Sequence, residues 1–295
     1  MAHTNTARRR DNEVARERAA RLRAEQQRRE RRRRLAIIGG TVAALLAVVA
    51  VIVVVGVTSK HTSSKAGLPD RTAVPANVLS SVTGVPAATL DAVGRGSVVS
   101  VPKAVNDGAL TANGKPKIFY VGAEFCPFCA GSRWALVQAL SRFGTFNGLS
   151  LTWSSSNDSF PETPSFSFHG ATYTSDVITF TGSELETRTG APLDTLPATE
   201  AGIWHRYTGP QGSFPFLDVA GHFVEAGQSV NPATLKGLTA AEIASRLSDP
   251  ADAVAQEVDG SANLLTAAIC HATGNLPAAV CTAKGVVAAG KALGG

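Results

Sequence analysis

The chain has 295 residues with 28 Lys+Arg and 23 Asp+Glu, but its net charge of +5 is unevenly distributed. Residues 1–34 hold 13 Arg and 5 acidic residues, net +8, which leaves the remaining 261 residues at net −3. A nucleic-acid-binding domain carries its basic side chains on the folded part of the chain, so we expect no nucleic-acid partner. With 44% hydrophobic residues the chain can bury a core, which excludes disorder throughout.

Residues 35–57, LAIIGGTVAALLAVVAVIVVVGV, form an uncharged run that reaches about 35 Å as a helix, enough to cross a lipid bilayer. A cleaved signal peptide is the alternative, but its apolar region would be roughly 7–15 residues long and would end at a small-residue cleavage site. Residues 1–34 form an Arg-rich tail, and its last residues, Arg31–Arg34, favour retention in the cytoplasm. We therefore expect a single-pass protein of the cell membrane, with a cytoplasmic N-terminus and an extracytoplasmic C-terminal domain.

The tail itself has a second interpretation, as an RNA-binding or anionic-lipid-binding segment. It contains no aromatic residue for base stacking, so we favour a topology determinant that lies on the inner leaflet.

Elements of an α/β domain follow a polar linker at residues 58–75. A short helix is expected over 76–84 and a strand over 96–105. Residues 117–121, KIFYV, predict a compact strand, and residues 130–144 have helical spacing that stops at Gly144. Between these two elements lies Cys126-Pro127-Phe128-Cys129, so the predicted order is strand, CxxC turn and helix.

The second half of the domain continues the alternation of strands and helices. Strands are predicted over 148–154 and 173–180, a helix over about 197–207, and a hairpin within 213–227 that turns at 220–222. Thr239 followed by Glu242 is a capping box that opens a helix ending near Ser248. Residues 249–295 are expected to form a C-terminal helical extension.

Cys126 and Cys129 are the main candidates for chemistry. Cys126 falls at the predicted N-terminus of a helix, where the dipole and the free amides favour an anion and lower the pKa of a thiol. Cys129 lies one turn further in, where it can attack a mixed disulfide on Cys126. Half of a zinc site and an inert structural disulfide are the alternatives. The zinc site would need two further ligands, and no second CxxC or nearby HxxxH is present.

These residues resemble the thioredoxin superfamily. YVGAEFCPFC is similar to the strand and active-site turn of that superfamily, and Ser213–Val219 (SFPFLDV) is similar to its cis-proline segment. The resemblance implies a thioredoxin-like mixed sheet flanked by helices over residues 76–248, with an insertion at about 154–212. It also implies that Pro215 is cis, and that Phe214 and Pro215, together with Pro127 and Phe128, contact substrate chains.

A narrower resemblance covers the whole chain. The Arg133–Val137 stretch (RWALV), the FPF-type segment and the C-terminal cysteine pair are similar to an uncharacterised family of membrane-anchored thioredoxin-like proteins. One position departs from the thioredoxin pattern, because Tyr120 stands where thioredoxins keep a buried carboxylate six residues before the first cysteine. Glu124 is a possible substitute, although we expect it to be a surface residue. No His lies between the two cysteines to stabilise a thiolate strongly, so an intermediate redox potential is expected.

Cys270 and Cys281 are eleven residues apart, about 16 Å along one continuous helix, which is too far for a disulfide. Gly274-Asn275 and Pro277 break that helix, however, and predict a helical hairpin that brings the two cysteines together. A structural disulfide that stabilises the extension by about 3 kcal/mol is favoured. The alternative is a relay pair that exchanges electrons with Cys126 and Cys129.

The functional expectation is a thiol–disulfide oxidoreductase that needs no cofactor and no metal. Its expected partners are cysteine-containing extracytoplasmic proteins, a redox-recycling protein of the membrane and the lipid bilayer. Two other classes stay open, a non-catalytic scaffold that keeps both disulfides for structure and a thiol-based copper protein. Met1 is the only methionine, so the copper protein would lack thioether ligands.

Overall fold

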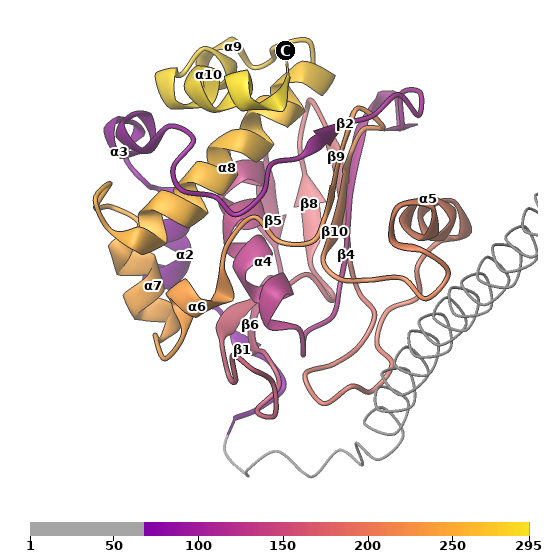
Figure 1. Ribbon diagram of the computed structural model, residues 1–295, viewed down its shortest axis with the longest axis vertical. Helices are drawn as coiled ribbons and strands as arrows, with labels where there is room; N and C mark the ends of the chain where they lie inside the picture. Colours follow the sequence, from indigo (N-terminus) through magenta and orange to yellow (C-terminus); the bar gives the residue numbers. More distant parts are fainter. Residues whose placement is uncertain (1–67, 295) are drawn as a thin grey trace, which may run out of the picture. The chain divides into compact units, whose positions relative to one another are not determined.

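A computed structural model describes residues 68–294 of the chain (Figure 1). The predicted tail (1–34), the predicted membrane span (35–57) and most of the predicted linker lie outside the described residues. Within the part that is described, no helix is both long enough and apolar enough to span a membrane.

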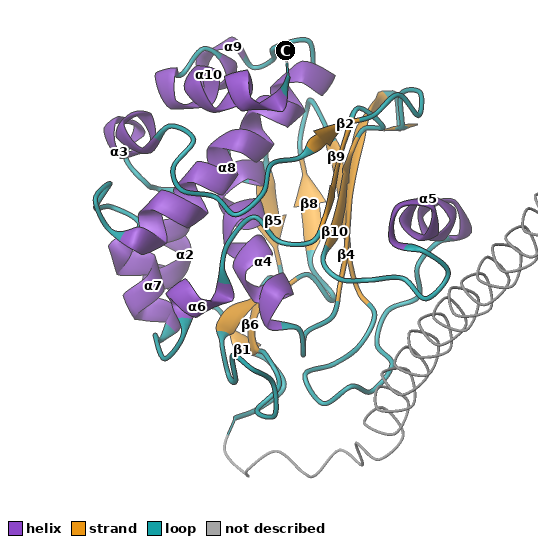
Figure 2. Ribbon diagram, viewed as in Figure 1, coloured by secondary structure: helices purple, strands orange, loops and turns teal. Residues whose placement is uncertain are grey.

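The described chain contains a mixture of short strands and helices (Figure 2). The helices are α2 (Ala76–Thr83), α3 (Ala87–Val93), α4 (Pro127–Leu140), α5 (Ala198–Thr208), α6 (Pro232–Leu235), α7 (Ala240–Arg246), α8 (Ala253–Ala272), α9 (Ala278–Cys281), α10 (Lys284–Gly290) and the 3₁₀ turn η1 (Lys291–Leu293). The strands are β1 (Thr72–Ala73), β2 (Lys103–Ala104), β3 (Thr111–Ala112), β4 (Lys115–Gly122), β5 (Thr145–Asn147), β6 (Ser150–Trp153), β7 (Pro164–Ser167), β8 (Thr172–Thr174), β9 (Thr179–Glu184), β10 (Phe216–Val219) and β11 (Phe223–Ala226).

The largest sheet is mixed and is built around β4. β4 pairs with β10 in antiparallel register, so that Tyr120 lies opposite Leu217, and it pairs with β9 in parallel register. β10 and β11 form the expected antiparallel hairpin, β2 adds to the edge of β11, and β3 pairs with the start of β4. Strands β1, β6 and β7 form a second sheet, and β5 pairs with β8.

Helices cover both faces of this mixed sheet (Figure 1). Because side chains alternate along a strand, Ile118 and Tyr120 of β4 join the large apolar cluster under α4 and α8. Phe119 and Val121 point the other way and pack with Trp204 of α5. The apolar run KIFYV is therefore buried on both faces, and the fold is a mixed α/β arrangement with its sheet between helices.

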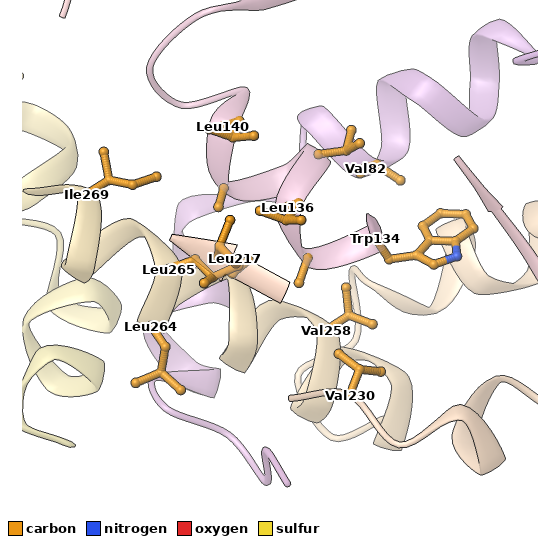
Figure 3. Close-up of a cluster of buried hydrophobic side chains, with 14 of the residues drawn as sticks. Val82, Trp134, Leu136, Leu140, Leu217, Val230, Val258, Leu264, Leu265 and Ile269 are labelled. Carbon is orange, nitrogen blue, oxygen red and sulfur yellow. The ribbon is translucent and has the colours of Figure 1, made fainter. Parts of the chain in front are cut away.

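Helices α4 and α8 form the centre of the core (Figure 3). Trp134, Leu136 and Leu140 of α4 belong to the same buried apolar cluster as Val258, Leu265 and Ile269 of α8. Residues 249–295 are largely helical, as the sequence predicts, and α8 packs directly on the helix that follows the CxxC turn. The spacing of apolar residues identifies a helix but does not tell which partner it packs against.

Two predicted strands are shorter than expected, for local reasons. Over 173–180 the hydroxyl of Ser175 accepts the amides of Val177 and Ile178, which turns the chain and separates β8 from β9. Over 96–105 the amide of Val99 donates to the carbonyl of Ser229 instead of a neighbouring strand, and Pro102 has no amide to donate. Only Lys103 and Ala104 pair with β11.

The end of the predicted linker belongs to the fold. Thr72 and Ala73 pair with β6, and the Asp70 carbonyl accepts a hydrogen bond from Thr152. Arg71 reaches Glu124 beside the CxxC turn. Residues 70–73, predicted as part of the linker, therefore belong to the folded domain.

The C-terminal helical hairpin closes with a disulfide. α8 ends at Ala272, α9 begins after Pro277, and the Cys270 and Cys281 Cα atoms are 5.6 Å apart with their sulfurs bonded. The break between the two helices is the one that the sequence predicts. In the chain-entropy model, a loop of this length gives a stabilisation of about 3 kcal/mol.

The buried carboxyl group of Asp259, at the contact of α4 with α8, should make the stability of the protein depend on pH. Its Oδ1 accepts from Gln138 Nε2 at 2.7 Å, while Oδ2 and Gln138 Oε1 are buried without partners. Burial raises the pKa of Asp259 to about 7, against smaller opposing effects of Gln138 and Arg142. Since the folded state holds this proton more tightly than the unfolded state, the stability that Asp259 contributes is present below about pH 4 and is lost as pH rises through about 7.

Asp259→Asn should therefore stabilise the protein at pH 8 by about 1–3 kcal/mol, because an amide can pair with both polar atoms of Gln138 and leaves no buried carboxylate. At pH 5 the gain should be smaller, because the folded wild type still holds the proton and only part of the Asp259 contribution has been lost. Urea denaturation at both pH values measures the effect. The exposed Asp249→Asn serves as control and should change stability by less than about 0.5 kcal/mol at either pH. An equal effect of Asp259→Asn at pH 5 and pH 8 would contradict the argument.

Candidate active site

The CxxC turn sits between the end of β4 and the start of α4. Cys126 is the N-cap residue of α4, and its sulfur accepts the amide of Cys129 at 3.4 Å. Pro127 occupies the first helical position, where its fixed φ suits the helix and its missing amide hydrogen costs nothing. The predicted order of strand, CxxC turn and helix is confirmed.

The two thiols have different environments. Both are reduced; Cys126 is 6% exposed and Cys129 is fully buried. A hydrogen bond from the Cys129 thiol lowers the pKa of Cys126, burial opposes this, and the Cys129 amide and the Arg133 guanidinium lower it further. Burial raises the pKa of Cys129 well above its ordinary value. Of the two thiols, Cys126 therefore loses its proton first, and Cys129 keeps its proton to higher pH.

A buried ion pair lies directly behind the cysteines. Arg133 is fully buried one turn beyond Cys129, with Nε and Nη2 at 2.8 and 2.6 Å from the two carboxylate oxygens of Glu184 at the end of β9. Nη2 also donates to the Ala123 carbonyl in the turn that carries Cys126, at 2.6 Å. Burial lowers the pKa of Arg133, but the charge of Glu184 raises it. The net change in pKa is upward, so the guanidinium stays charged.

The sequence alone assigns no role to Arg133 and Glu184. The position of Arg133 in the apolar stretch RWALV indicates a buried charge, but it does not indicate the partner. Its partner Glu184 is 51 residues away in the sequence, with nothing local to indicate the contact.

Glu124 corrects another expectation. It is expected at the surface, but it is fully buried and accepts from Arg71 Nη1 at 2.9 and 3.0 Å and from the Ser167 hydroxyl at 2.5 Å. Its amide donates to the Glu186 carbonyl. Glu124 therefore joins the N-terminal segment to the turn before Cys126.

Tyr120 lies under the cysteines. An added Cβ at Gly122 would collide with the Tyr120 hydroxyl, so the tyrosine ring runs over Gly122 toward the CxxC turn, in space that only glycine leaves free. Arg133 lies 6.0 Å from the ring centroid. Burial raises the pKa of Tyr120 well above its ordinary value, and its hydroxyl is close enough to the Cys129 thiol for each to influence the other.

Aromatic side chains surround the mouth of the site. Phe125 and Phe214 pack edge to face with ring centroids 6.3 Å apart, and Phe128 meets Phe160 in the same way. Both Phe125 and Phe214 pack against the cluster of Ala123, Cys126 and Cys129. Trp204 of α5 stacks on Phe214 at 5.5 Å. The four phenylalanine rings are half-buried and form a rim of apolar surface next to Cys126, whereas Trp204 is buried behind Phe214.

The Phe214–Pro215 peptide bond is cis, as the resemblance implies. Pro215 is buried and its carbonyl accepts the amide of Gly227. The structure thus brings Phe214 of the proline segment to the cysteines, although the two segments are more than eighty residues apart in the sequence.

The second cysteine pair is in a different cluster. Cys270 and Cys281 belong to the large core cluster, apart from the small cluster that holds Cys126 and Cys129. His271 contacts Phe223 and His222 with ring centroids 5.2 and 5.3 Å away. Across residues 68–294, no three His, Cys, Asp or Glu side chains are grouped so that they could hold a metal ion.

Residues 102–271, more than half of the chain, match the model of a family described as Domain of unknown function (DUF929). The chain belongs to the DUF929 family. The DUF929 match includes the CxxC turn, Arg133, Glu184 and Phe214–Pro215, and it ends directly after Cys270. No curated protein and no solved structure matches the chain.

Proposed function

We propose that this DUF929 protein is a membrane-anchored, extracytoplasmic thiol–disulfide oxidoreductase that acts on cysteines of secreted or membrane proteins. The observation that carries the proposal is the asymmetry of the two thiols, with the thiolate favoured on Cys126 at the mouth of the site and the proton held on buried Cys129. That division of roles is what a nucleophile and a resolving thiol require.

The fold that we propose is thioredoxin-like. Its support is the order β11–β10–β4–β9 in a mixed sheet with helices on both faces, and the approach of Phe214 to the CxxC turn. The anchor and its orientation rest on the uncharged run at residues 35–57 and on the arginines before it. Anchoring would raise the effective concentration of the domain near a membrane redox partner.

The chemistry proceeds in two exchanges. The Cys126 thiolate attacks a substrate disulfide, forms a mixed disulfide and releases one substrate thiolate, which takes a proton. The Cys129 sulfur then loses its proton and attacks the Cys126 sulfur, which releases the second substrate thiol and leaves a Cys126–Cys129 disulfide. The substrate gains two electrons, and the protein loses them. The reverse sequence oxidises a substrate dithiol, and a membrane redox-recycling partner restores the starting state in either direction.

The burial of Cys126 favours a second candidate, a scaffold in which both cysteine pairs are structural. Glutathione titration of the full chain in detergent, with mass-spectrometric assignment of each cysteine, distinguishes the two. A potential between about −120 and −270 mV for Cys126 and Cys129, with Cys270 and Cys281 still bridged, supports exchange chemistry. A pair that resists reduction below about −300 mV would instead be structural, and the enzyme proposal would fall.

A further inference from the structure

A small cavity lies between the mixed sheet and the two central helices. Its polar lining comes from Tyr120 on β4, Ser132 on α4, Glu225 on β11 and Ser229 in the loop after β11. The cavity measures about 10 Å³, close to the smallest volume that holds one water molecule. Among the residues that line it, Glu225 is the one with an ionisable carboxyl group.

Two polar atoms of this lining are buried without a hydrogen-bond partner among residues 68–294, the Tyr120 hydroxyl and Glu225 Oε2. Each such atom costs about 1–3 kcal/mol if nothing satisfies it. Tyr120, Leu217 and Glu225 lie opposite one another on the adjacent strands β4, β10 and β11, so their side chains share the face under α4. Both side chains line the cavity, so a water held there would have two otherwise unpartnered polar groups beside it.

Resolution of a mixed disulfide requires a route for the Cys129 proton. The Cys129 thiol is fully buried, so solvent does not reach it directly. The neighbouring Tyr120 hydroxyl keeps its own proton, because burial raises its pKa; it can therefore pass a proton on but cannot store one. Storage needs a further group beyond the tyrosine.

Glu225 has the properties of that group. Burial raises its pKa to about 7, against smaller opposing effects of hydrogen bonds from Ser229. The polar groups that face it are Tyr120 on β4, Ser132 on α4 and Ser229, which in turn contacts Ser261 of α8 at 2.5 Å.

We propose that Glu225 is the proton reservoir for Cys129, linked to it by one water in the cavity and by the Tyr120 hydroxyl; this inference rests on the proposed function. When the Cys129 sulfur attacks the Cys126 sulfur of a mixed disulfide, the thiol proton passes to the Tyr120 oxygen, the tyrosine proton passes to the water, and a water proton passes to the Glu225 carboxylate. The new sulfur–sulfur bond forms as the substrate thiolate leaves. In the reverse direction Glu225 returns the proton.

The two steps can be separated with Ellman's disulfide as substrate, using the reduced full chain in detergent and stopped-flow absorbance. Attack by Cys126 releases the first thionitrobenzoate, and attack by Cys129 releases the second. Glu225→Gln should leave the first phase unchanged and slow the second at pH 8 on the order of 10²-fold, the low end for a positioned acid–base group. It should also remove the rise of the second phase with pH through about 7.

Tyr120→Phe, which keeps the ring and removes the hydroxyl, should slow the second phase in the same way. The Tyr120→Phe variant tests the relay if Glu225→Gln does not fold. Asp218→Asn is the matched control, because Asp218 is another buried carboxyl of the same sheet, beside α5 on the opposite face. It should change neither phase.

A second phase with the wild-type rate and pH profile in both Glu225→Gln and Tyr120→Phe would overturn the relay while the proposed function stands. If the wild-type protein shows no first phase, the proposed function is wrong, and the relay is wrong with it.

Discussion

Cys126→Ser is expected to abolish disulfide exchange, whereas Cys129→Ser is expected to stop the reaction after the first step and accumulate a mixed disulfide. The reason is the difference between the two environments, since the Cys126 thiolate is favoured at the mouth of the site and Cys129 is fully buried. Only the first sulfur can meet an external disulfide, and only the second can release the product. Turnover of a disulfide-bonded test protein and non-reducing mass spectrometry of the trapped species measure both effects.

The C-terminal pair supplies the matched control. The double variant Cys270→Ser/Cys281→Ser should keep the exchange rate and lose about 3 kcal/mol of stability, because a loop of that length is no longer constrained in the unfolded chain. A loss of turnover with the Cys126–Cys129 potential unchanged would favour the relay alternative for Cys270 and Cys281. Equal activities of Cys126→Ser and Cys129→Ser would contradict the assignment of nucleophile and resolving thiol.

The parts of the fold that depend on neighbouring residues were predictable from the sequence. The KIFYV strand, the helix start at Cys126-Pro127, the Thr239 capping box and the hairpin turn at residues 220–222 are set by local spacing and turn chemistry, and the structure has all four. The helix break before Pro277 is of the same kind.

The parts of the site that depend on distant contacts were not predictable in this way. Glu124 meets Arg71 across 53 positions and Arg133 meets Glu184 across 51, and no local pattern links the members of either pair. Glu225 reaches the cavity through strand register, which becomes known only when β11 is aligned on β10 and β4. A single sequence therefore indicates the thiols and leaves out the charges that control them.

Replacing Arg133 should lower the stability of the protein and also raise the pKa of Cys126. Arg133→Met removes one member of a fully buried ion pair and leaves the Glu184 carboxylate without its charge partner, which is expected to cost about 3–5 kcal/mol. The pKa of Cys126 should rise as well, because the guanidinium is one of the groups that lower it. Urea denaturation gives the first quantity, and the pH dependence of iodoacetamide alkylation at Cys126 gives the second.

The double variant Arg133→Met/Glu184→Gln separates structure from electrostatics. It contains no uncompensated buried charge, so it should recover part of the lost stability, while the pKa of Cys126 should stay raised because no cation has returned. Arg188→Met is the control, since Arg188 is a second buried arginine that donates to the Leu68 carbonyl at 2.9 Å. It should lower stability and leave Cys126 alkylation unchanged. If Arg133→Met destabilises the protein and the alkylation profile does not move, Arg133 supports the turn mechanically, through Ala123, and has no electrostatic role at Cys126.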